Sequence, residues 1–166
     1  MTTADYTATR TYAATRTWAP RAWFINIRQR LGSFPLSIIQ LAMRIAVGSV
    51  FFKAGLLKFN SFEFAIKLFE DEYKVPVLSP MVAARLAMFN ELTWPMFLFL
   101  GLATRFATLP LLVMISVIQL FVYPQAWTDN LLWASILVFL LTRGAGVLSL
   151  DYLIERSLSK KRQSST

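Results

Sequence analysis

The chain has 166 residues, of which 56% are hydrophobic and only 16% are charged, and this composition is too apolar for a soluble domain of its length. Its 17 lysines and arginines outnumber its 9 acidic residues, which in a membrane protein indicates topology and contact with membrane lipid rather than binding to nucleic acid. It contains no cysteine and no histidine, so thiol relays, serine–histidine triads, zinc sites and histidine-ligated haem are excluded. We therefore predict an integral membrane protein without metal or haem, in which any redox chemistry depends on a partner or a diffusible cofactor.

Residues 1–35 form a basic N-terminal arm with five arginines and one acidic residue. Its apolar residues recur at steps of three and four, the spacing of a helix that lies in the membrane interface: Trp23, Phe24, Ile27 and Leu31. The alternatives are a disordered basic tail and an organelle transit peptide. The arm lacks the continuous apolar core and cleavage site of a secretory signal, so we expect it to stay on the protein.

Four apolar segments follow, each close to the roughly 20 residues that cross a hydrocarbon layer of about 30 Å. They cover residues 36–57, 82–102, 106–123 and 131–149. A polar loop joins the first two segments, and short turns join the others. The predicted fold is therefore all-α, an antiparallel bundle of four transmembrane helices over residues 36–155, followed by a basic tail over residues 156–166.

Charges that flank the segments predict their orientation. The N-terminal arm, the turn GLATR at 101–105 and the ending ERSLSKKR at 155–162 are basic, whereas the first and third loops are acidic. The acidic residues are Glu63, Glu70, Asp71, Glu72 and Asp129. Both termini are therefore expected in the cytoplasm.

Charged residues inside the segments are expected to pair, because an isolated charge in the bilayer is costly. Arg44 and Glu91 lie at similar depth on two consecutive antiparallel helices, so we predict a direct or water-bridged pair between them. If they do not couple, Lys58 or Arg85 is the next candidate partner of Glu91. Lys53 is expected to extend to the outer membrane surface.

Two polar clusters result. Polar side chains in the outer half of the bundle outline a candidate binding cavity: Lys58, Asn90, Glu91 and Gln119. The alternative is that these groups only hold the helices together. At the cytoplasmic side we expect Arg105 and Arg143 to approach the carboxylate of Asp151, unless the arginines bind lipid phosphate instead.

The order and spacing of these motifs resemble those of the DoxX family of small four-helix membrane proteins over about residues 36–155. The matching features are Arg44, FFKAG at 51–55, Lys58, Glu91, GLATR at 101–105 and RGAGVLSLD at 143–151. Family members often carry His or Tyr before the glycine of the first helix, where this chain has Lys53 and Ala54. A histidine-dependent site is therefore not expected here.

The resemblance implies a bacterial inner-membrane protein associated with quinone-linked redox complexes, such as the membrane subunit of a thiosulfate:quinone oxidoreductase. We therefore expect an accessory subunit that binds a quinone in the outer polar cavity, although the chain holds no complete catalytic constellation of its own. Two other functions stay open. One is a scaffold that recruits a soluble partner enzyme. The other is a small-solute transporter, and because four helices leave little room for a water-filled path, the chain would then have to form a homo-oligomer.

Overall fold

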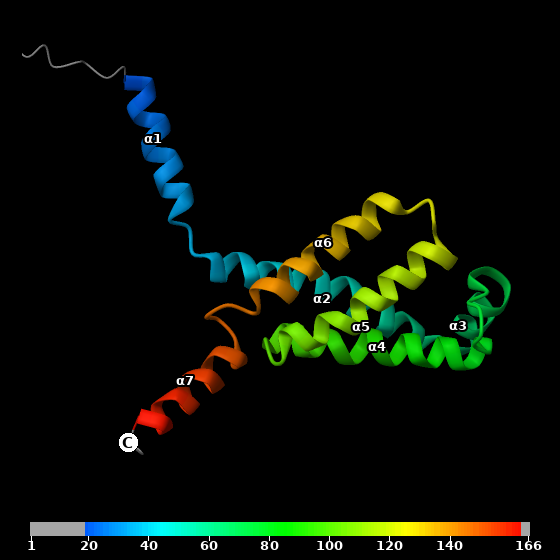
Figure 1. Cartoon of the computed structure of the whole chain (residues 1–166). Helices are drawn as coiled ribbons and strands as arrows, with labels where there is room; N and C mark the ends of the chain where they lie inside the picture. The colour runs from blue at the N-terminus through cyan, green and yellow to red at the C-terminus, as the bar shows by residue number, and fades with distance from the viewer. Residues whose placement is uncertain (1–18, 164–166) are drawn as a thin grey trace, which may run out of the picture. The chain divides into compact units, whose positions relative to one another are not determined.

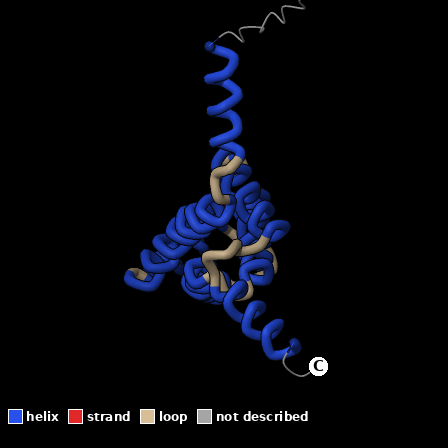
Figure 2. Tube along the Cα trace, turned by 90° about the vertical axis from the view of Figure 1, so that its left-hand side faces the viewer, coloured by secondary structure: helices blue, strands red, loops and turns tan. Residues whose placement is uncertain are grey.

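The computed structural model of the chain describes residues 19–163, and within this range it contains helices and no β-strand (Figure 2). The all-α prediction is confirmed for this part of the chain. Residues 1–18 of the predicted arm lie outside the described residues, as do the side chains of Arg21 and Leu31. Contacts divide the chain between Phe34 and Pro35 into two compact units.

The first unit contains one described helix, α1 (Ala19–Gly32). Trp23 and Phe24 are largely exposed, and their rings meet edge to face at a centroid distance of 5.3 Å. A helix therefore forms where the apolar spacing of the arm predicts one. Its position in a membrane interface stays a prediction.

The second unit is built around four long helical segments. These are α2 (Leu36–Asn60), α4 (Pro80–Leu100), α5 (Thr104–Val117) with its π-helical extension η2 (Ile118–Val122), and α6 (Trp127–Arg143). In Figure 1, successive long helices run in opposite directions. α2 packs on α4, α4 on α5, α5 on α6, and α6 returns to α2, so the four close into a ring.

Proline and glycine set the ends of these helices. Pro80 occupies the first turn of α4, where its missing N–H has no helical partner to lose. Gly101 ends α4 with a φ of 64°, and the N–H groups of Gly101 and Leu102 donate to the carbonyls of Leu98 and Phe97. The connection to α5 is therefore tight, as an antiparallel helix pair requires.

The structure corrects the polar loop between the first two segments. Part of it is helical, with α3 (Phe62–Leu68) continuing into the π-helical turn η1 (Phe69–Tyr73). Ala65 and Phe69 recur at a helical step and are buried in one cluster with three alanines of α4, Ala83, Ala84 and Ala87. Because small side chains line that face of α4, the loop can pack on it as a helix.

The structure also corrects the C-terminal end of the fourth predicted segment, which the sequence prediction places too far along the chain. α6 ends at Arg143, and residues 144–149 form an irregular connection to α7 (Leu150–Gln163), where the sequence predicts a continued helix to 149. Gly144 and Gly146 have φ angles of 78° and 81°, a region that favours glycine, so the chain turns here. α7 continues to Gln163, so the described part of the predicted basic tail is helical.

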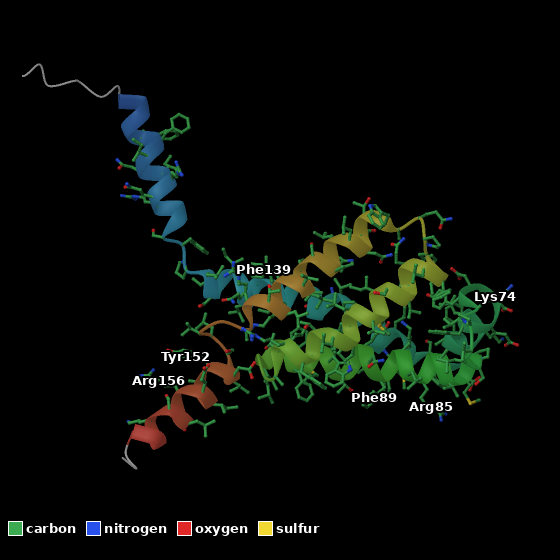
Figure 3. All side chains as sticks on the ribbon, viewed as in Figure 1. Lys74, Arg85, Phe89, Phe139, Tyr152 and Arg156 are labelled. Carbon is green, nitrogen blue, oxygen red and sulfur yellow. The ribbon has the colours of Figure 1, made fainter. Side chains whose placement is uncertain are left out.

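The ring has an apolar core that also encloses a charged residue, and it carries large apolar side chains on its outward faces. Arg44 has no exposed surface, whereas Phe89, Val113 and Leu120 on the outward faces are 58%, 65% and 67% exposed. Figure 3 shows Arg85 and Phe89 on the outward side of α4. An apolar exterior of this kind suits contact with lipid.

By length and composition, two segments are suited to cross a membrane, Leu36–Asn60 and Thr104–Val122. α6 has only 17 residues, and α4 carries Arg85 and Glu91 among its apolar side chains. Two of the four predicted spans are thus supported, and the membrane crossing of α4 and α6 stays a prediction.

Gly101→Ala should destabilise the protein. An alanine at a φ of 64° costs about 1–2 kcal/mol, and its Cβ would collide with the Arg44 guanidinium. We expect a lower melting temperature in detergent. Gly32→Ala is the control, because no atom lies within 4 Å of the added Cβ there. Equal melting temperatures for the two variants would contradict the packing of Arg44 against Gly101.

Candidate functional site

A cavity of about 390 Å³ lies between α2, α4, α5 with η2, and η1 with the connection that follows it, and we call it the outer cavity. Most of its wall is apolar, with side chains such as Phe69, Ala87 and Met114. The polar residues on its wall are Lys58, Asn90, Glu91, Tyr73 and Tyr123. A mostly apolar cavity with a few convergent polar groups is the usual form of a small-molecule site.

The central polar feature of the outer cavity is an ion pair between α2 and α4. Lys58 Nζ donates to both carboxylate oxygens of Glu91, at 2.8 and 2.7 Å, and the two side chains are only 15% and 5% exposed. Gly55, one helical turn before Lys58, makes this approach possible. A Cβ at Gly55 would lie 2.9 Å from the Glu91 Cβ, so any larger residue would push α4 away.

The predicted pair between Arg44 and Glu91 does not form, because each residue has other partners. Arg44 donates from Nη1 to the carbonyl of Leu98 at 3.3 Å and from Nη2 to the carbonyl of Leu148 at 2.5 Å. Side chains on a helix point back toward its N-terminus. On two antiparallel helices, residues at similar depth therefore extend toward opposite ends, which takes Arg44 to the end of α4 and Glu91 to Lys58.

Of the other residues predicted to line the cavity, Asn90 does so and Gln119 does not. Asn90 Oδ1 accepts a hydrogen bond from Trp94 Nε1 at 2.8 Å, which leaves its amide N–H groups for the cavity. Gln119 is a residue of η2, and its side chain binds α6 instead of lining the cavity. Its Oε1 accepts from Asn130 Nδ2 at 2.8 Å, and its Nε2 donates to the carbonyl of Pro124 at 2.9 Å.

Sequence reasoning did not find the two tyrosines at the mouth of the cavity as site residues. Tyr123 Oη donates to Glu72 Oε1 at 2.6 Å, and the rings of Tyr73 and Tyr123 meet edge to face at 5.6 Å. The bond to Glu72 raises the pKa of Tyr123, and burial raises the pKa of Tyr73, so both phenols stay protonated. The available signal was the acidic character of the first loop, which the sequence analysis used only to predict orientation.

The predicted ion pairs of Asp151 are replaced by backbone hydrogen bonds. Its two carboxylate oxygens accept from the N–H groups of Ala103 and Thr104, at 2.6 and 3.0 Å. Arg105 and Arg143 are exposed, and within residues 19–163 the one ion pair is that of Lys58 with Glu91. The first N–H groups of a helix have no partner inside it, so the carboxylate stabilises the start of α5 instead of a guanidinium.

Gln40 is a buried polar residue that the sequence analysis did not single out. It is 4% exposed, and its Nε2 donates to the carbonyl of Gly144 at 3.0 Å. A Cβ at Gly146 would collide with its Oε1. Gln40 and Arg44, one turn apart on α2, thus both bind backbone carbonyls of the 144–149 connection.

Comparison with known proteins gives a family. The sequence model of DoxX matches residues 39–124. An uncharacterized protein of Haemophilus influenzae is 32% identical over 126 residues, which cover 70% of this chain and 83% of that protein. No solved structure gives a significant match.

Lys58→Met and Glu91→Gln should each destabilise the protein, on the order of 3 kcal/mol, because either change leaves a buried group without its partner. The double variant should lose much less than the sum. Unfolding in detergent measures the coupling. Arg44→Ala combined with Glu91→Ala should be additive, and strong coupling there would restore the pair predicted from the sequence.

Asp151→Ala should lower stability by about 1 kcal/mol, the usual effect of losing a side-chain acceptor at a helix start. Asp151→Asn should lose less, because one acceptor oxygen remains. Arg105→Gln and Arg143→Gln should leave the melting temperature unchanged. If the arginine variants melt as low as Asp151→Ala, the ion pairs contribute after all.

Proposed function

The chain belongs to the DoxX family of membrane proteins, and from this premise we propose that it is a multi-pass protein of the bacterial inner membrane whose four long helices all cross the bilayer. The closed ring of α2, α4, α5 and α6, with apolar side chains on its outward faces, supports four crossings. Basic residues near the α4–α5 turn and in α7, against acidic residues in 63–72, support both termini in the cytoplasm.

We propose that the outer cavity binds the headgroup of a quinone. A quinone is a flat apolar ring with two carbonyl acceptors, and the cavity offers an apolar wall with one ammonium donor, Lys58 Nζ. The amide of Asn90 is a second donor. The observation that carries this proposal is the Lys58–Glu91 pair, which joins α2 to α4 and at the same time lies on the wall of an apolar cavity.

Glu91 gives the site a group that can exchange protons. Reduction of a quinone to a quinol takes two electrons and two protons. When Lys58 turns from Glu91 to a quinone carbonyl, the Glu91 carboxylate is left to take up a proton from water and pass it to a ring oxygen, once for each of the two protons. The chain has no cysteine or histidine and hence no redox centre of that kind, so the electrons come from a partner protein. The proposed role is therefore that of an accessory subunit in a quinone-linked redox system.

A purely structural ion pair is the main alternative, because Lys58 and Glu91 also join α2 to α4. The two roles differ in what a ligand does. Substitutions in a purely structural pair should leave the affinity for quinone unchanged, whereas substitution of a residue in the binding site should change that affinity.

Titration of the purified protein with a short-chain ubiquinone or menaquinone analogue, followed by quenching of tryptophan fluorescence, tests the proposal. Trp94, which binds Asn90, lies close enough to report on the cavity. Lys58→Met should weaken binding at least about tenfold, the effect of losing one hydrogen bond from a charged donor. Glu91→Gln should weaken it less and should change its dependence on pH.

Lys53→Met is the matched control, since Lys53 lies on the same helix and is exposed. It should bind the analogue like the wild type. Equal affinity in all four proteins, or no binding to the wild type, would rule out the quinone site and leave a structural pair.

A further inference from the structure

A second cavity, of about 740 Å³, lies at the opposite end of the ring from the outer cavity. It is lined by residues at the start of α2, the start of α5, the end of α6 and the first turns of α7. We call it the end cavity. This inference rests on the proposed crossing of the bilayer by all four long helices, which would place the helix ends that meet at this cavity at the level of the lipid headgroups.

Two arginines on the wall of the end cavity have no anionic partner. Arg105 and Arg143 line it, and no carboxylate within residues 19–163 lies within 4.0 Å of either guanidinium. A Cβ at Gly144 would lie 3.4 Å from Arg105 Nε, so Arg105 lies against the residue that follows Arg143. Two guanidinium groups on one wall suit a phosphate group, which arginine binds through paired hydrogen bonds.

Two carboxylates also line the end cavity, and they differ in availability. Asp151 uses both oxygens on the N–H groups of Ala103 and Thr104. Glu155, one turn further along α7, is exposed and forms no ion pair with any described residue. The wall therefore presents sites for a phosphate and, next to them, one free acceptor for a cation.

Large apolar side chains share the same cavity. Leu36, Phe106 and Val147 line it and are 47%, 62% and 54% exposed. A soluble phosphate ester would leave this surface in water. A ligand with acyl chains would cover it.

We propose that the end cavity binds the headgroup of an aminophospholipid such as phosphatidylethanolamine, with the phosphate on Arg105 and Arg143, the ammonium group on Glu155, and the acyl chains over Leu36 and Phe106. The site is independent of the quinone proposal, since it shares no residue with the outer cavity. Bound lipid joins α7 to the ring through ligand contacts in addition to the Asp151 hydrogen bonds.

Native mass spectrometry of the delipidated full chain, titrated with short-chain phosphatidylethanolamine, phosphatidylglycerol or soluble phosphoethanolamine, tests the proposal. The wild type should bind phosphatidylethanolamine several-fold more tightly than phosphatidylglycerol, and soluble phosphoethanolamine should compete poorly. Arg105→Gln with Arg143→Gln should weaken both lipids at least about tenfold. Glu155→Gln should remove the preference between the lipids without weakening phosphatidylglycerol.

Arg156→Gln is the matched control, an exposed arginine of α7 that does not line the cavity (Figure 3). It should bind both lipids like the wild type. An equal loss of lipid affinity in Arg156→Gln and in the double variant would show that general surface charge causes the effect, and it would overturn the proposed site. Equal wild-type affinity for the two lipids would overturn the role of Glu155. Equally tight binding of soluble phosphoethanolamine would make the ligand a soluble phosphate ester and not a lipid.

Discussion

The arrangement of the second unit depends on how one fully buried charge, Arg44, is satisfied. Its guanidinium donates to the carbonyls of Leu98, at the end of α4, and of Leu148, in the connection before α7. Carbonyl groups at a helix C-terminus carry partial negative charge, so they stabilise the guanidinium of Arg44, which forms no ion pair with a carboxylate of residues 19–163. Three separate segments are joined by this one side chain, and Gly101 is required because any Cβ there would occupy the place of the guanidinium.

The two ends of the ring use polar groups differently. At the end with Arg44, Gln40 and Asp151, side chains bind backbone groups of turns and helix ends, which fixes the path of the chain. At the other end, Lys58 and Glu91 bind each other beside a cavity. A bond between two side chains can be exchanged for a bond to a ligand, whereas a capped helix end cannot lose its acceptor without cost. Lys58 and Glu91 can therefore exchange partners more easily than Arg44, Gln40 and Asp151 can.

The outer cavity exists because the first connection is ordered. α3 and η1 pack on the small residues of α4, and the contact of Tyr73 and Glu72 with Tyr123 extends the cover to the end of η2. The cover is therefore attached on two sides of the cavity mouth. The irregular π-helical geometry of η1 and η2 occurs in both segments that form this mouth, a common feature of functional sites.

The sequence by itself determined the all-α class, the family, and the four long helical segments, because continuous apolar runs and helix-ending glycines and prolines are local signals. It did not determine α3 and η1 or the turn at 144–149. It also identified Lys58, Asn90 and Glu91 as neighbours, since polar residues in apolar helices usually face the interior of the bundle and one another. Only the tertiary structure decided the pairing. Arg44 and Glu91 have similar depth but extend toward opposite ends of antiparallel helices, and Asp151 meets N–H groups that no sequence pattern assigns to it. Partner choice among buried polar groups depends on side-chain direction and on backbone groups from distant segments, and spacing along the chain records neither.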